Sequence, residues 1–142
     1  MIAELPELIR KSFPRTWYHP QYRLLTWFPR GVFNAAFANQ VLEFAQLEES
    51  IQDTPFDRYT DFSGLTDIRL KVDHVFQIAR RRGAVRQPVK SAFVADKPTT
   101  FVLAQMYEHL MKHAVIDVRA FRDHKTAAKW LGVPLKILQP PS

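Results

Sequence analysis

The sequence contains no cysteine, only four glycines and no long apolar run. The lack of cysteine excludes disulfides, thiolate zinc sites, iron–sulfur clusters and cysteine nucleophiles. Gly64 has neither a second glycine nor a Lys-Ser/Thr pair close to it, so no phosphate-binding loop for a nucleotide is indicated. No segment reaches the roughly 18 uninterrupted apolar residues that a membrane-spanning helix requires.

Charged residues also interrupt the N-terminal segment, where Glu4, Glu7, Arg10 and Lys11 stand. A secretory signal requires an uninterrupted apolar stretch at this place. We therefore expect a cytoplasmic protein without a membrane span.

The 142 residues are 46% hydrophobic, 24% charged and 13% aromatic. This is the composition of a folded globular chain, and the length is that of one ordinary domain. We expect a single domain over 1–142, with a core at about 15–133 and flanking segments at 1–14 and 134–142.

Hydrophobic periodicity divides the chain into strands and helices. Alternating, β-branched and aromatic residues predict strands at 16–19, 22–28, 58–64, 89–96 and 116–121. Apolar residues at helical spacing predict helices at about 34–50, 66–82, 100–110 and 125–131. Asn34, Thr99 or Thr100, and Asp123 are the expected N-caps. Gly83 and Gly132 are the expected residues after two of the helices.

The order of these elements predicts the fold class. Two strands, three helix–strand units and a final helix give an α/β fold with a mostly parallel four- to five-stranded sheet and about four helices. The N-terminal hairpin would add an antiparallel edge to this sheet. We expect the helices to cover at least one of its faces.

Three segments together resemble a known family. Segment 57–68 reads as a strand that ends in Asp-Phe-Ser-Gly, and segment 89–108 as an interior strand followed by a helix with a Met-Tyr pair. The third segment lies near the C-terminus and has two parts, a strand motif from Val118 to Phe121 and a helix motif from Ala127 to Leu131. This order resembles the SpoIIAA-like branch of the STAS superfamily, the domains related to anti-sigma-factor antagonists. The resemblance covers about 15–132 and implies a SpoIIAA-like fold and a non-enzymatic binding or regulatory role.

The sequence departs from that family where phosphorylation acts. Antagonists of this type resemble one another in a hydroxyl-bearing motif shortly after the strand end that corresponds to Asp61. In this chain the positions that correspond to this motif are occupied by Arg69, Leu70, Lys71 and Val72, and none of these side chains carries a hydroxyl. Leu70 cannot be phosphorylated, so a phosphoserine switch is excluded at this position.

Polar residues gather where the predicted parallel strands end. Ligands of open parallel sheets bind beyond this edge, and helix N-termini there favour anions. The alternative is that these residues are only helix caps and turn residues. The candidate binding loop at the strand ends consists of Asp61, Ser63, Thr66, Asp96, Thr99 and Asp123.

The formal net charge is +6, and the densest cationic segment is 80–90. A basic balance is compatible with a nucleic-acid partner, whereas the ordinary alternative is a solvated helix C-terminus. The candidate basic patch consists of Arg80, Arg81, Arg82, Arg86 and Lys90.

Aromatic residues suggest two further kinds of site. Alternation in the first hairpin predicts that some aromatic side chains form an exposed contact surface for a protein partner or a homodimer. That candidate surface consists of Trp17, Tyr18, Tyr22 and Trp27. Other aromatic residues on the helices either line an apolar pocket or fill a dry core. These residues are Phe37, Phe44, Phe76, Phe101 and Tyr107.

Catalytic and metal motifs are weak. His109 and His113 have the spacing of a two-histidine metal site, but the residue after His109 is Leu110 and not the glutamate of a zincin. No Gly-x-Ser-x-Gly motif marks a serine nucleophile. We therefore predict a non-enzymatic binding domain without cofactor or metal that recognises a protein partner or an apolar small molecule. The alternative is a nucleic-acid-associated protein that uses segment 80–90.

Overall fold

The computed structural model describes residues 14–51 and 55–140. Its main sheet has five strands in the order β1-β2-β4-β6-β7. The strands are β1 (Thr16–His19), β2 (Leu24–Trp27), β4 (Asp57–Asp61), β6 (Lys90–Val94) and β7 (Asp117–Phe121). β1 and β2 form an antiparallel hairpin at one edge, and all other neighbours in this sheet are parallel. The predicted α/β fold with a mostly parallel sheet and an antiparallel hairpin is confirmed.

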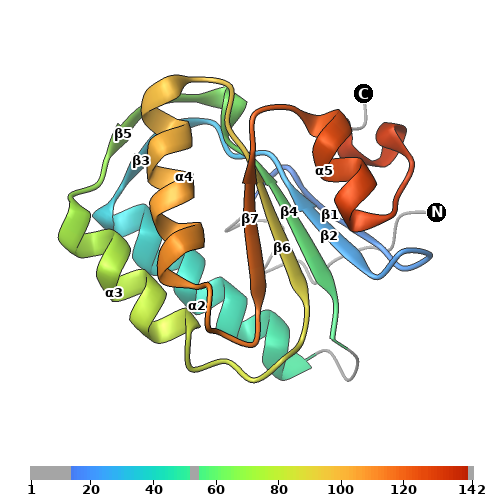
Figure 1. Ribbon diagram of the computed structural model, residues 1–142, viewed down its shortest axis with the longest axis horizontal. Helices are drawn as coiled ribbons and strands as arrows, with labels where there is room; N and C mark the ends of the chain where they lie inside the picture. The colour runs from blue at the N-terminus through green and yellow to red at the C-terminus, as the bar shows by residue number, and fades with distance from the viewer. Residues whose placement is uncertain (1–13, 52–54, 141–142) are drawn as a thin grey trace.

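Four α-helices flank this sheet within the described residues, in agreement with the predicted number. They are α2 (Ala35–Ile51), α3 (Val72–Arg82), α4 (Pro98–Leu110) and α5 (His124–Leu131). α2, α3 and α4 lie together on one side of the sheet, and α5 lies apart from them near the hairpin (Figure 1). We call the two sides the three-helix face and the α5 face. No helix in the described part of the chain is long and apolar enough to cross a membrane.

Two predicted caps are present. The Asn34 side chain accepts a hydrogen bond from the Phe37 backbone N–H at 2.9 Å, just before α2. The Asp123 carboxylate accepts one from the Thr126 N–H at 2.8 Å, at the start of α5. Gly132 then ends α5 with a left-handed φ of 73°, a conformation that costs glycine least.

The predicted helix over 66–82 is wrong in its first part. Residues Leu65–Arg69 form strand β5, which pairs in parallel with β3 (Gly31–Asn34) in a separate two-stranded sheet. The helix α3 begins only at Val72. Pairing with β3 overrides the helical spacing of Ile68 with Val72 and Val75, because β-strand formation depends on the partner strand more than on local propensity.

The N-cap predicted for the third helix is also wrong. α4 begins at Pro98 with Lys97 as its N-cap residue, two or three residues before the predicted cap at Thr99 or Thr100. Proline suits the first helical position because it has no N–H to leave unpaired and its φ is already helical. Gly83 does follow α3, but its φ of −64° is right-handed, so glycine is not required there by conformation.

The C-terminal flanking segment contributes to the core. Residues Leu135–Leu138 form a short 3-10 helix, η2, and Leu138 is only 2% exposed. η2 packs against α5 rather than extending away from the domain. Of the other flanking segment, 1–14, all but Pro14 lies outside the described residues.

The core is organised differently on the two faces. On the α5 face, one cluster joins the sheet, α5 and η2. On the three-helix face, the buried side chains form two main clusters, one around Trp27 and Phe33 and the other around Ile116 and Val118. The space between these two clusters is the candidate site.

Candidate functional site

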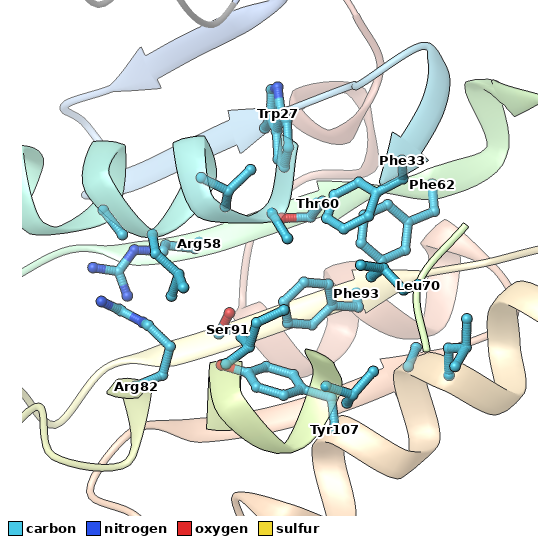
Figure 2. Close-up of a pocket in the computed structure, with 18 of the residues that line it drawn as sticks. Trp27, Phe33, Arg58, Thr60, Phe62, Leu70, Arg82, Ser91, Phe93 and Tyr107 are labelled. Atoms are coloured by element: carbon cyan, nitrogen blue, oxygen red, sulfur yellow. The ribbon is translucent and has the colours of Figure 1, made fainter. Parts of the chain in front are cut away.

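A cavity of about 160 Å³ lies between the main sheet and helices α2, α3 and α4. The small β3–β5 sheet contributes Phe33 and Ile68 to its lining. Figure 2 shows the side chains that enclose it, which come from both clusters of the three-helix face. Ten of the lining residues are labelled there: Trp27, Phe33, Arg58, Thr60, Phe62, Leu70, Arg82, Ser91, Phe93 and Tyr107.

Several short side chains in the lining help to explain why the space is left open. Arg58 and Thr60 alternate along β4, and both line the cavity. Ser91 and Phe93 are their partners on β6. The helices contribute short side chains to the same lining, namely Ala38, Ala45, Thr100 and Ala104. Because a helix packs on a sheet at a nearly fixed distance, short side chains on both sides leave unfilled volume.

One end of the cavity is aromatic. The ring centroids of Phe33 and Phe62 lie 5.7 Å apart, those of Phe62 and Phe93 5.6 Å, and those of Phe93 and Tyr107 5.6 Å. Trp27 packs edge-on against Phe37 at 5.6 Å. These spacings are typical of favourable aromatic contacts, so each ring limits the movement of its neighbour. The cavity is therefore bounded by side chains that hold one another in place.

Two arginine side chains line the other end of the cavity. Arg58 is the second residue of β4, and Arg82 is the last residue of α3. Figure 2 shows both guanidinium groups at the same end of the cavity. Arg82 is only 7% exposed, and the Arg58 guanidinium carbon lies 5.0 Å from the centroid of the Phe56 ring. Both arginines make further interactions within the chain.

The predicted strand-end residues form caps and turns at the carboxyl edge of the sheet. Asp61 accepts hydrogen bonds from the Ser63 N–H at 2.9 Å and from the Ser63 hydroxyl at 2.7 Å. This turn holds Phe62, the residue between them, which lines the cavity. Hydrogen bonds from Thr126 lower the pKa of the Asp123 carboxyl. A ligand role for these residues stays a prediction.

The remaining three strand-end candidates are exposed. Thr66 lies in β5, Asp96 lies in the loop after β6, and Thr99 lies in the first turn of α4. None of the three lines the cavity. The nearby Lys97 is engaged instead, because its ammonium group donates to the Leu65 carbonyl at 2.6 Å and so connects α4 to β5.

The structure does not bring the five candidate basic residues onto one surface. Arg80, Arg81 and Arg86 are exposed, whereas Arg82 points into the cavity on the three-helix face. Lys90 donates from its ammonium group to the Trp130 carbonyl at 2.8 Å, and Trp130 belongs to α5. Arg82 and Lys90 therefore lie on opposite faces of the main sheet.

The four aromatic residues of the hairpin are also divided between the faces. Trp27 is 9% exposed and lines the cavity, and Tyr18 packs on Phe56 with ring centroids 6.0 Å apart. Trp17 packs on Phe28 at 5.7 Å, and Tyr22 contacts the cluster of the α5 face. All four are buried or half-buried, so they do not form one exposed surface.

Of the two alternatives for the helix aromatics, an apolar pocket or a dry core, a cavity is present but most of these residues do not line it. Of that set, Tyr107 lines the cavity, whereas Phe76 is 49% exposed and Phe101 lies under the Arg122 guanidinium at 4.4 Å. Phe37 packs on Trp27 and Phe33, and the Phe44 side chain lies outside the described residues. The sequence reasoning missed Arg58, whose signal was a charged residue alternating with Thr60 in a central strand.

The two histidines with the spacing of a two-histidine metal site lie on the surface. His109 and His113 are both exposed. Among residues 14–51 and 55–140, no group of three His, Cys, Asp or Glu side chains is placed to hold a metal ion.

A solved structure with a similar fold supports this architecture. It is an uncharacterized protein of the DUF3478 family from Shewanella loihica PV-4, with a SpoIIAA-like fold, and it superposes with a TM-score of 0.50. The match covers 92% of this chain and 90% of that chain at 12% sequence identity. No protein-family model matches the sequence, and no curated protein does. The fold is therefore SpoIIAA-like, and the sequence is divergent.

Proposed function

We propose that this protein is a non-enzymatic binding domain whose cavity takes an apolar small molecule. The observation that carries the proposal is the cavity of about 160 Å³ on the three-helix face, lined mainly by apolar side chains. A cavity of about 150 Å³ with an apolar lining binds benzene. The volume between α2, α3, α4 and the sheet therefore suits a ligand with one ring.

The energetic cost of an empty cavity supports a role for this one. At about 24 cal/mol per Å³, a cavity of about 160 Å³ destabilises a core by about 4 kcal/mol relative to a filled one. The free energy of unfolding of an ordinary domain is only about 5–15 kcal/mol. A ligand that fills the space recovers part of that cost.

The chemistry of the lining favours binding over catalysis. The polar side-chain groups of the described lining are the hydroxyls of Thr60, Ser91, Thr100 and Tyr107, together with two guanidinium groups. No Asp, Glu, His or Lys is among the described lining residues, and those are the usual general acids and bases. Leu70, at the place of the phosphorylated hydroxyl in related antagonists, belongs to this lining.

Binding of benzene and toluene tests the proposal. We expect saturable binding of one molecule, measured by chemical-shift changes of the cavity methyl groups and by a rise in melting temperature. Ala104→Leu would fill the cavity and abolish binding, because Ala104 is 4% exposed and lines it. Val102→Leu is the matched control, since Val102 lies on the same helix and is 60% exposed. Absence of saturable binding, or equal binding to both variants, would contradict the proposal.

A protein partner is the second candidate function. Exposed apolar side chains on the neighbouring helices α3 and α4 favour it: Val72 is 52% exposed, Phe76 49% and Val102 60%. Sedimentation of the protein over a range of concentrations tests self-association through this surface. Phe76→Gln would shift the equilibrium towards monomer if this surface holds two copies together.

The nucleic-acid alternative receives less support from this arrangement. Affinity for a polynucleotide depends on how many cations reach the phosphates from one surface. Arg82 and Lys90 are directed to opposite faces of the sheet, which leaves Arg80, Arg81 and Arg86 exposed in this segment. Its test is the salt dependence of polynucleotide binding.

A further inference from the structure

We infer that the ligand of this cavity is a neutral phenol with one ring, whose hydroxyl group hydrogen-bonds to the side chains of Thr60 and Ser91 and whose ring lies among the phenylalanines. The inference rests on the proposed function and deepens it, because it assigns one polar group and its position to the otherwise apolar ligand. It follows from two buried hydroxyl groups in the lining that have no partner among the described residues.

The two hydroxyl groups are buried without a hydrogen bond. Thr60 is 7% exposed and Ser91 is 6% exposed, and both line the cavity. Neither side chain forms a hydrogen bond with another described residue. A hydroxyl group in a protein interior is unfavourable unless it is hydrogen-bonded. A ligand with a complementary polar group removes that cost, whereas a hydrocarbon ligand does not.

The strand register brings these hydroxyl groups onto the same part of the sheet. β4 and β6 are parallel neighbours, and Arg58 is the register partner of Ser91. Two residues further along both strands, Thr60 is the register partner of Phe93. Because side chains alternate along a strand, all four point to the three-helix face, where they line the cavity. Thr60 and Ser91 are therefore diagonal neighbours, and a small polar group placed between them can hydrogen-bond to one or both.

Aromatic rings lie on one side of this polar position. Phe93 follows Ser91 by two residues within β6, and Phe62 follows Thr60 by two residues just after β4. The rings of Phe33, Phe62 and Phe93 are in contact in this order. In Figure 2 the two hydroxyl oxygens lie between the labelled arginines and the rings of Phe33 and Phe62. A ligand that reaches the hydroxyls can therefore place an aromatic ring against the edges and faces of these rings.

A phenol fits both the volume and the polarity of this space. A cavity of about 150 Å³ with an apolar lining binds benzene, so the volume of about 160 Å³ suits one ring with one small substituent. The hydroxyl of a phenol titrates at about pH 10, so it is neutral at pH 7 and can both donate and accept a hydrogen bond. No part of the ligand is assigned to Arg58 or Arg82, because both make other interactions within the chain.

The test compares phenol with toluene, in which a methyl group replaces the hydroxyl, by calorimetry on the purified chain at pH 7. In a cavity without polar partners, phenol would bind more weakly than toluene, because its hydroxyl would leave water and find no hydrogen bond. We expect phenol to bind at least as tightly as toluene. A weaker affinity for phenol than for toluene would overturn the inference.

Removal of both protein hydroxyls assigns the effect to these residues. Thr60→Val replaces one hydroxyl with a methyl group of similar size, and Ser91→Ala removes the other. The double variant should bind phenol at least about tenfold more weakly and toluene within about twofold of the original affinity, because only phenol loses hydrogen bonds. Retained toluene binding also shows that the variant is folded with its cavity intact. A smaller change in the ratio of the two affinities would overturn the inference.

Thr16→Val is the matched control. Thr16 is 7% exposed and lies in β1 of the same sheet, and its hydroxyl also has no partner among the described residues, but it does not line the cavity. This variant should leave the affinities for phenol and toluene unchanged. An equal loss of phenol binding in Thr16→Val would point to a general effect on the fold and overturn the inference.

The possible results separate the two proposals. Binding of toluene together with weaker binding of phenol would overturn the assigned hydroxyl group and leave the proposed apolar site intact. Equal affinity for cyclohexanol and phenol would overturn the aromatic ring. Failure of phenol, toluene and benzene alike to bind would overturn the proposed function as well.

Discussion

The two faces of the main sheet both carry apolar side chains and yet are packed in different ways. On the α5 face, large side chains of the sheet fit against small ones of the helix: Tyr59 and Ala127 are both fully buried there, and Leu138 of η2 closes the cluster. On the three-helix face, Thr60 and Ser91 meet Ala38 and Ala104 across an open space.

The difference shows that side-chain size at facing positions decides where a core is closed. Large residues opposite small ones interdigitate, whereas small residues opposite small ones leave a cavity. Close packing on the α5 face therefore stabilises the fold, whereas the cavity on the three-helix face provides the space for the proposed ligand. Changes that alter packing should have opposite effects on the two faces.

Truncation on the α5 face has the largest expected effect. Leu24 is 0% exposed and belongs to the continuous cluster, so Leu24→Ala should lower the free energy of unfolding by about 2–5 kcal/mol. Urea unfolding followed by circular dichroism measures the change. A loss below about 1 kcal/mol would mean that the α5 face is not closely packed.

Enlargement of a buried alanine should distinguish the faces by sign. Ala127→Leu has no space on the α5 face, where Ala127 is 0% exposed, and should destabilise the protein by about 1–3 kcal/mol. Ala104→Leu fills part of the cavity and should stabilise the free protein by about 0.5–2 kcal/mol. The same urea measurement serves both variants, and equal signs would refute the difference between the faces.

Acidification should act through a buried histidine of the hairpin. Burial lowers the pKa of His19, which is 5% exposed and hydrogen-bonded to the Thr26 hydroxyl at 3.1 Å. As pH falls below about 6.5, the unfolded chain takes up the proton first, so the free energy of unfolding decreases by at most about 1.4 kcal/mol per pH unit. Below the pKa of His19 in the folded protein, the folded and the unfolded state both carry the proton, so the free energy of unfolding no longer decreases through this residue.

His19→Gln is the variant that isolates this effect. Glutamine can keep a hydrogen bond to Thr26 but does not titrate, so the dependence of unfolding free energy on pH should become shallower below about pH 6.5. An unchanged pH dependence in His19→Gln would assign the acid sensitivity to other groups.

Removal of one buried hydroxyl should have the smallest effect. Tyr59 is fully buried, its hydroxyl has no hydrogen-bond partner among the described residues, and burial raises its pKa. Tyr59→Phe keeps the ring, which packs on Phe28 at 5.9 Å, and should raise the unfolding free energy by about 1 kcal/mol. A clear destabilisation would indicate that the hydroxyl has a partner in solution.

The sequence predicted the elements whose signal is local. Strands β4, β6 and β7, helix α2 with its Asn34 cap, and helix α5 with its Asp123 cap follow from periodicity and capping chemistry. The β3–β5 pair could not be recognised, because Gly31 and Leu65 are far apart in the chain and each strand is short. Such a pairing exists only in the assembled fold.

The cavity was only partly predictable, for a similar reason. A sequence specifies which side chains are large but not the distance between a helix layer and a sheet. Arg82 did carry a readable signal, because it stands at helical spacing from Val75 and Ala79, which are both buried. Its place in a run of three arginines favoured a solvated interpretation instead.

Xenon binding followed by methyl resonances tests the contrast between the two faces most directly, because xenon occupies apolar cavities of this size without changing their charge. We predict saturable shifts for Leu103 and Ile116, which line the cavity, and none for Leu24 and Leu138 on the α5 face. Ala104→Leu should suppress these shifts. Equal shifts on both faces, or no saturable shift at all, would contradict the proposal that the three-helix face holds a cavity for a ligand.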